Sequence, residues 1–155
     1  MRRMDLATLA ATMTATVPFA RTLGITYEAV SVADDGVTVV CALPDVVDHH
    51  NHVGGPHAGA IFSLGETASG AVVMAAFGDQ VGRATPLAVR AEIGYRKLAM
   101  GEVRATARLG RPVADVLAEL DAGQRPQFEV PVEVVTVDGT VTTEMRVVWT
   151  LRLNR

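Results

Sequence analysis

Cysteine is almost absent from this chain, which contains only Cys41. One cysteine excludes an internal disulfide and a cysteine-based zinc site, and it fits the reducing cytoplasm, where we expect the protein to act. Basic residues are also few. The 14 Lys and Arg are outnumbered by 17 Asp and Glu and form no clustered stripe, so we expect no nucleic-acid partner.

Charged residues make up only 20% of the chain, whereas apolar residues make up 49%, and this balance excludes a disordered protein. A chain of 155 residues buries enough surface on folding to form a hydrophobic core. No repeat, low-complexity stretch or linker divides the sequence. We therefore predict a single domain over 1–155.

Two apolar stretches resemble membrane-associated segments, but both are interrupted by polar residues. An aspartate and several threonines interrupt the alanine-rich stretch after Arg2 and Arg3, which favours a short helix over 5–15 rather than a secretory signal. The stretch 57–77 is long enough to span a bilayer, but it contains Glu66 and several glycines. We predict a buried core helix at 57–77 and no membrane partner.

Alternation of apolar and polar residues is the strongest pattern in the chain, and it predicts half-buried strands. The predicted strands are 25–32, 36–43, 87–95, 103–109, 128–134 and 140–153. Asp34-Asp35-Gly36 and Asp138-Gly139 are typical of hairpin turns between the first two and the last two strands. In the third strand the predicted inward-facing residues are Leu87, Val89, Ala91, Ile93 and Tyr95.

A further helix is predicted over 112–121, because apolar residues recur there at the i, i+3, i+4 and i+7 positions. It lies within a segment, 111–124, that is either a lid or interface element, or a helix packed against the sheet. The helix at 57–77 is apolar nearly all round and must be covered on every side. We therefore predict an α+β fold, with an antiparallel sheet of about six strands wrapped around this central helix.

Glu66 lies in the middle of the predicted central helix, where an unpaired carboxylate is costly to bury. We expect it to be paired, protonated or next to a cavity. Small neighbours would let a backbone or a ligand approach closely; they are Gly65, Ala68, Ser69 and Gly70. Two interpretations remain open, an ion pair with an arginine at a subunit interface and a chemical role.

A glycine-rich loop leads into this helix. Its sequence is Asn51-His52-Val53-Gly54-Gly55-Pro56-His57-Ala58-Gly59. The free N–H groups and the dipole at a helix start favour negative charge, so an oxyanion can bind where this loop ends.

The stretch from Asn51 to Gly70 resembles the hotdog-fold acyl-CoA thioesterases of the phenylacetyl-CoA and 4-hydroxybenzoyl-CoA type, especially an uncharacterised branch of that superfamily. In the family pattern an Asn leads into a Gly-containing loop, then a His-Gly-Gly turn, then a helix that carries Asp or Glu. The matching residues are Asn51, Gly54, His57, Gly59 and Glu66. Ala58 stands where the family usually has glycine, so its N–H is available only if φ there is negative.

The resemblance implies hydrolysis of an acyl-CoA thioester. Glu66 would be the base or nucleophile, and the Ala58 N–H would stabilise the oxyanion. Asn51 would orient the attacking water or the carboxylate, and His57 would support the loop or the thioester carbonyl. The resemblance also implies a homo-oligomer, either a dimer or a tetramer, with an active site shared between neighbours and no bound cofactor.

The substrate-binding residues that we expect are Gly59, Ser69, Arg90, Arg96 and Lys97. The resemblance suggests that Arg90, Arg96 and Lys97 meet the phosphates of coenzyme A. The alternative interpretations are a solvated strand face for these basic residues and a small packing residue for Ser69.

Other functions use the same residues. Hotdog dehydratases of 3-hydroxyacyl thioesters pair a loop histidine with a helix glutamate, as His52 and Glu66 would be paired here, and a non-catalytic acyl-binding protein would need no chemistry at all. A metal site is conceivable from the loop's histidines and aspartates, which are Asp45, Asp48, His49, His50, His52 and His57. The loop lacks the helical i, i+4 pairing of a known zinc motif, so we predict no metal.

Overall fold

The computed structural model describes residues 4–33 and 36–155. Its elements are α1 (Leu6–Thr16), α2 (Pro18–Thr22), β1 (Thr26–Ala33), β2 (Gly36–Leu43), η1 (Val47–His49), α3 (Ala58–Phe77), η2 (Gly78–Gln80), β3 (Ala84–Tyr95), β4 (Val103–Arg108), α4 (Val113–Asp121), β5 (Gln127–Thr136) and β6 (Val141–Leu153). The three predicted helices and six predicted strands are all confirmed. Arg2, Arg3 and the Asp34-Asp35 part of the first predicted turn lie outside the described residues.

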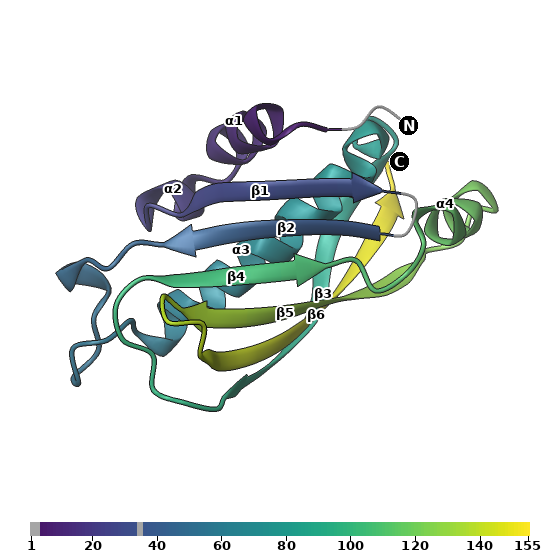
Figure 1. Cartoon of the computed structure of the whole chain (residues 1–155). Coiled ribbons are helices and arrows are strands. Elements are labelled where there is room, and N and C mark those ends of the chain that lie inside the picture. The colour runs from purple at the N-terminus through teal and green to yellow at the C-terminus, as the bar shows by residue number, and fades with distance from the viewer. Residues whose placement is uncertain (1–3, 34–35) are drawn as a thin grey trace.

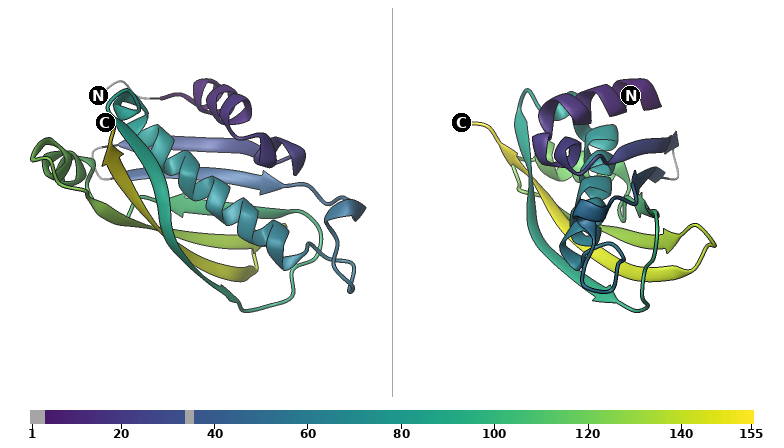
Figure 2. Two further views of the ribbon diagram at one scale, coloured as in Figure 1. Left: turned by 180° about the vertical axis from the view of Figure 1, so that it is seen from behind. Right: turned by 90° about the vertical axis from the view of Figure 1, so that its left-hand side faces the viewer.

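The six strands form one antiparallel sheet with the order β1-β2-β4-β5-β6-β3. The sheet curves around α3, which packs mainly against β2, β4 and β5 (Figures 1 and 2). This arrangement confirms the predicted α+β class and the central helix. It leaves β1 and β3 as the two edges of the sheet.

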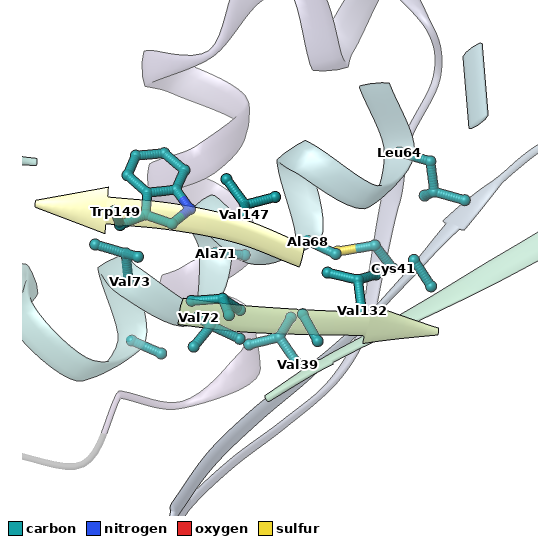
Figure 3. Packing of buried hydrophobic residues seen from close by; sticks show 14 of the residues in the cluster. Val39, Cys41, Leu64, Ala68, Ala71, Val72, Val73, Val132, Val147 and Trp149 are labelled. Carbon is teal, nitrogen blue, oxygen red and sulfur yellow. The ribbon is translucent and has the colours of Figure 1, made fainter. Parts of the chain in front are cut away.

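The core lies between α3 and the inner face of the sheet, where small helix residues allow close packing (Figure 3). A Cβ at position 65 would lie 2.6 Å from Sδ of Met145, so any larger residue there would have to displace this methionine side chain. The stretch Ala58–Gln80 is long and apolar enough to cross a membrane, but 72% of its most apolar window is buried. It is therefore the core helix that the sequence predicts.

The N-terminal segment forms two helices, of which only the first was predicted. The Asp5 carboxylate caps α1 by accepting a hydrogen bond from the Thr8 N–H at 2.8 Å. Leu9 and Met13 are the buried residues of this helix, which packs against β1 and α3. Pro18 then starts the short α2 at a position where its missing N–H costs no hydrogen bond.

The predicted inward face of β3 is correct for Ala91, Ile93 and Tyr95 but wrong for Leu87, because a bulge at Val89 shifts the alternation by one residue. Ala88 pairs with Trp149, whereas Arg90 pairs with the adjacent Val148, so one extra residue lies between these pairs. Before the bulge it is Ala88, paired with Trp149, that faces inward, so its neighbour Leu87 lies on the outer face. The residues that share the inner face are Ala84, Pro86, Ala88, Ala91, Ile93 and Tyr95.

Most side chains of β3 also remain partly or fully exposed, because this strand lies at the edge of the sheet. Val89 is 47% exposed and Tyr95 is 48% exposed. By contrast, the inward-facing residues predicted for the central strand β5 are all buried; they are Phe128, Val130, Val132 and Val134.

Helix α4 anchors its apolar face in the core. Val116 and Leu120 are fully buried, and Val113 and Leu117 pack partly against the same cluster. The helix lies at the opposite end of the sheet from the loop that leads into α3 (Figure 1). The burial and the location both favour the packing interpretation of this segment over a lid on that loop.

Candidate active site

The loop between η1 and α3 is closed by main-chain hydrogen bonds. His50 and Pro56 form an isolated antiparallel bridge, and the His57 N–H donates to the carbonyl oxygen of His49 at 2.7 Å. The Asn51 side chain fills the loop from within. Its Oδ1 accepts from the N–H groups of Val53 at 3.0 Å and Gly55 at 3.3 Å. In this structure Asn51 therefore fixes the loop backbone.

His57 is the N-cap residue of α3. Its Nδ1 accepts a hydrogen bond from the Gly59 N–H at 2.8 Å, which sets the ring with Nε2 as the remaining nitrogen. A Cβ at position 59 would lie only 3.1 Å from this Nδ1. Glycine at 59 thus leaves the space that the histidine cap occupies.

The Ala58 N–H is left as an unpartnered donor at the start of α3. Of the other donors in this first turn, Gly59 binds the His57 ring, and Ala60 and Ile61 both donate to the His57 carbonyl oxygen at 2.9 and 3.0 Å. No acceptor among the described residues binds the Ala58 N–H. No described residue other than glycine has positive φ, so φ at Ala58 is negative and its N–H is available although the residue is not glycine.

Tyr95, the last residue of β3, is a site residue that the sequence did not reveal. Its hydroxyl donates to the Ala58 carbonyl oxygen at 2.9 Å across 37 residues of sequence. In the sequence it is one aromatic residue at the end of a strand, a pattern that fits an ordinary inward-facing packing residue as well as a site residue. The contact with Ala58 depends on how β3 approaches the start of α3, which the sequence does not indicate.

Glu66 lies half-buried on the one stripe of α3 that the sheet leaves partly open. Phe62, Ser63, Gly70 and Met74 share this stripe. Burial raises the pKa of the Glu66 carboxyl group above its usual value of 4.5. Within the part of the chain that the structure describes, Glu66 forms no ion pair. Its charge is therefore not compensated inside one protomer.

Ala58 and Glu66 are too far apart in one protomer to act on the same carbonyl group. Eight residues of helix separate them by about 12 Å along the axis and by about 80° around it. Oxyanion donors lie about 3 Å from the atom that they stabilise. A single site that uses both groups must therefore combine two copies of the chain.

Ser69 lies inside the core rather than in an open cleft. It is fully buried, its hydroxyl donates to the Glu66 carbonyl oxygen at 2.6 Å, and it accepts from Nε1 of Trp149 at 3.0 Å. This arrangement ties the indole to the helix backbone at Glu66. Both hydrogen bonds join Ser69 to the core, which favours the packing interpretation over the expected substrate-binding role.

The expected coenzyme A residues are all exposed: Arg90 lies in the middle of β3, and Arg96 and Lys97 directly follow its last residue. Arg96 is paired with Glu144 at 3.4 Å. It also borders a hollow of about 690 Å³ on the sheet face opposite α3, whose other charged residues are Glu92, Arg108, Glu133, Glu144 and Arg146. Neither Ala58 nor Glu66 lines this hollow, so it is separate from the proposed chemistry.

The loop histidines do not converge on one point. Nε2 of His50 donates to Oδ1 of Asp45 at 2.6 Å, whereas His52 is exposed in the loop and His57 caps α3. Across residues 4–33 and 36–155, no group of three or more His, Cys, Asp or Glu side chains has the arrangement of a metal site.

A six-stranded antiparallel sheet around one long helix defines the hotdog fold, and comparisons with known proteins agree. The chain belongs to the family described as a domain of unknown function, DUF4442, whose model matches residues 7–151. A comparison with the curated proteins finds no match.

Several solved structures share this fold over almost their whole length. One is a Pseudomonas aeruginosa protein of unknown function called a probable thioesterase, with a TM-score of 0.83, 22% identity, and coverage of 98% of this chain and 99% of the other. A second is a mutant of another P. aeruginosa thioesterase, with a TM-score of 0.74, 21% identity and coverage of 99% and 97%. A thioesterase family protein from Silicibacter pomeroyi has a TM-score of 0.72, 18% identity and coverage of 96% and 99%. At these identities the similarity shows the hotdog fold.

Proposed function

We propose that this protein hydrolyses the thioester bond of an acyl-CoA. The observation that carries the proposal is the free Ala58 N–H at the start of α3, because every neighbouring donor in that turn already has a partner. A fixed, unpartnered donor at a helix N-terminus suits the charge that develops on a thioester oxygen. The names of the structural neighbours support the same reaction class.

In this mechanism Glu66 attacks the thioester carbonyl carbon directly or removes a proton from the attacking water. The carbonyl oxygen gains negative charge as the new bond forms, and the Ala58 N–H of the partner protomer stabilises it. The C–S bond then breaks, and the coenzyme A sulfur takes up a proton and leaves as the thiol. In the water route this proton is the one that Glu66 removed from water. In the direct route a water molecule hydrolyses the acyl–Glu66 anhydride, which releases the acid, restores the carboxylate and supplies the proton. A raised pKa makes the Glu66 carboxylate a stronger base than an exposed one.

The two halves of this site meet if two protomers associate through β3. This strand is a long, exposed edge whose unpaired backbone groups are suited to pairing with another strand. Two-fold symmetry would place the open stripe of one α3 beside the α3 start of its partner. The proposed assembly is thus a homodimer, or a homotetramer built from such dimers.

The remaining site residues have supporting roles in this proposal. Asn51 holds the loop, and the His57 cap keeps Gly59 from competing for the oxyanion. Ser69 supports the helix backbone behind Glu66. Arg90 and Lys97 form no ion pair among the described residues, so they are available for the phosphates of coenzyme A.

The proposal is tested by Glu66→Gln, which keeps the side-chain shape but removes the base. Turnover of an accepted acyl-CoA, followed by thiol release, should fall by at least about 10²-fold. Glu129→Gln is the matched control, since Glu129 is exposed on β5 and should tolerate the same change. Hydration of an enoyl-CoA and binding without turnover are measured in parallel, because they identify a dehydratase or an acyl-binding protein.

Undiminished hydrolysis by a folded, correctly assembled Glu66→Gln variant would reject the assignment. If Glu66 instead pairs with an arginine of another subunit, the change leaves that charge buried alone. The free energy of unfolding should then fall by about 3 to 5 kcal/mol without a specific catalytic effect.

A further inference from the structure

The start of α3 is tied to the edge strand β3 by a single side chain. Tyr95 ends β3, and its hydroxyl donates to the Ala58 carbonyl oxygen at 2.9 Å. Among the described residues this is the one side-chain hydrogen bond that links β3 to α3. It therefore connects the sheet edge to the residue that supplies the proposed oxyanion donor.

Hydrogen bonds hold the peptide groups around Ala58, of which only the Ala58 N–H has no partner among the described residues. The carbonyl oxygen of Ala58 accepts from Tyr95, and the N–H of the same peptide group, that of Gly59, donates to Nδ1 of His57. The main chain before Ala58 is held in turn by the 2.7 Å bond from the His57 N–H to the His49 carbonyl oxygen. Tyr95 supplies the only one of these tethers that comes from the sheet.

We propose that Tyr95 is a positioning residue that holds the Ala58 N–H in the orientation required to stabilise the oxyanion. This inference rests on the proposed hydrolysis and assigns to Tyr95 no contact with the substrate. A fixed donor stabilises developing charge without reorganising during the reaction, whereas a small misplacement lowers the rate strongly. The tether also transmits the position of β3, the proposed dimer edge, to the oxyanion donor.

The hydroxyl is well suited to this role near neutral pH. Burial raises the pKa of Tyr95 above 10.0, so the group remains a protonated donor under these conditions. The Ala58 carbonyl oxygen has two lone pairs and can accept from Tyr95 in addition to the helix. The tether therefore does not disturb α3.

The test is Tyr95→Phe, which removes only the hydroxyl group. We expect kcat for acyl-CoA hydrolysis to fall about five- to tenfold while KM changes by less than about twofold, because the lost constraint acts in the transition state. Thr85→Val is the matched control: it removes a hydroxyl that bonds to Oδ1 of Asn154 at 2.7 Å, at the other end of the same strand. The thermal midpoint and the oligomeric state are measured for both variants.

The outcomes separate this inference from the proposed function when Glu66→Gln is assayed beside them. Loss of kcat in Tyr95→Phe alone, with Thr85→Val at wild-type turnover and the assembly intact, supports the positioning role. Wild-type kcat in Tyr95→Phe, with Glu66→Gln inactive, overturns the inference but leaves the function standing. Equal losses in Tyr95→Phe and Thr85→Val indicate a general effect on β3 and also overturn it. Full hydrolysis by Glu66→Gln rejects the function itself.

Discussion

The Ala58 N–H can be removed without disturbing the helix, because proline is favoured at the first helical position. His57, with φ of −61° and ψ of 143°, already has the extended conformation that a following proline requires. We therefore expect Ala58→Pro to fold normally and to lower kcat by about 10²- to 10³-fold, as the loss of one oxyanion donor does.

Steady-state hydrolysis and the thermal midpoint check this prediction. Val113→Pro is the control, since it makes the same change at the first residue of α4, after a residue with ψ of 137°. Full activity in a folded Ala58→Pro variant would contradict the oxyanion role.

The raised pKa of Glu66 predicts a defined pH dependence. A carboxylate acts as a base only when ionised, so hydrolysis should increase with pH as Glu66 loses its proton, at a pH above 4.5. Stability should follow the opposite direction. Because the folded state holds this proton more tightly than the unfolded state, ionisation of Glu66 destabilises the fold as pH increases through the raised pKa.

Glu66→Gln should accordingly be as stable as the wild type or more stable at neutral pH, and the difference should vanish below pH 4.5. Chemical unfolding of both proteins across this pH range measures the effect. A loss of stability in the variant at neutral pH indicates a buried ion pair instead.

At the residue scale, local sequence predicted well what depends on neighbours along the chain. The helix start at His57 could be predicted, because a helix cap is a local feature. For Glu66 the sequence indicated a costly buried position but left open whether the carboxylate is paired. The burial of Ser69 and the bond from Tyr95 to Ala58 could not, since each depends on a strand that is distant in sequence.

At the element scale, β3 is the proposed contact between protomers. Val89→Lys places a charge on this exposed edge, where it should weaken dimerisation and make turnover per protomer depend on concentration. Sedimentation and activity over a dilution series measure both effects. Val137→Lys, at a valine that is 72% exposed in the turn after β5, should change neither. An unchanged assembly in Val89→Lys would place the interface elsewhere.

Helix α4 should behave as a packing element. Leu120 is 1% exposed, so Leu120→Ala should lower the free energy of unfolding by about 2 to 5 kcal/mol without altering acyl-chain preference. Denaturant unfolding and a chain-length series of acyl-CoA substrates check the two parts. A changed preference with unchanged stability would restore the lid interpretation.

Element types were predictable because their hydrophobic periods are local, whereas the exposure of β3 was not. Alternation in 87–95 is the same whether a strand is central or at an edge, and neither neighbour of Val89 is a glycine or proline that would indicate a bulge. The position of β3 at the sheet edge comes from the pairing order of all six strands.

At the scale of the whole molecule, one protomer of 16.4 kDa contains both of the groups proposed to react, but its helix geometry keeps them apart. The helix separates Glu66 from Ala58 by about 12 Å, so assembly is a requirement of the proposed chemistry. We expect sedimentation at micromolar concentration to give a dimer or a tetramer, and a stable active monomer would contradict this requirement.

The shared site is tested most directly by mixing two inactive variants in one dimer. Co-expression of differently tagged Glu66→Gln and Ala58→Pro chains yields heterodimers, in which one site receives the intact Glu66 of one chain and the intact Ala58 N–H of the other. With random association, half of the dimers have one working site of two, so turnover should recover to about a quarter of the wild-type value. If each chain instead formed its own site, every site would carry one defect, and turnover would remain at the level of the two parent variants.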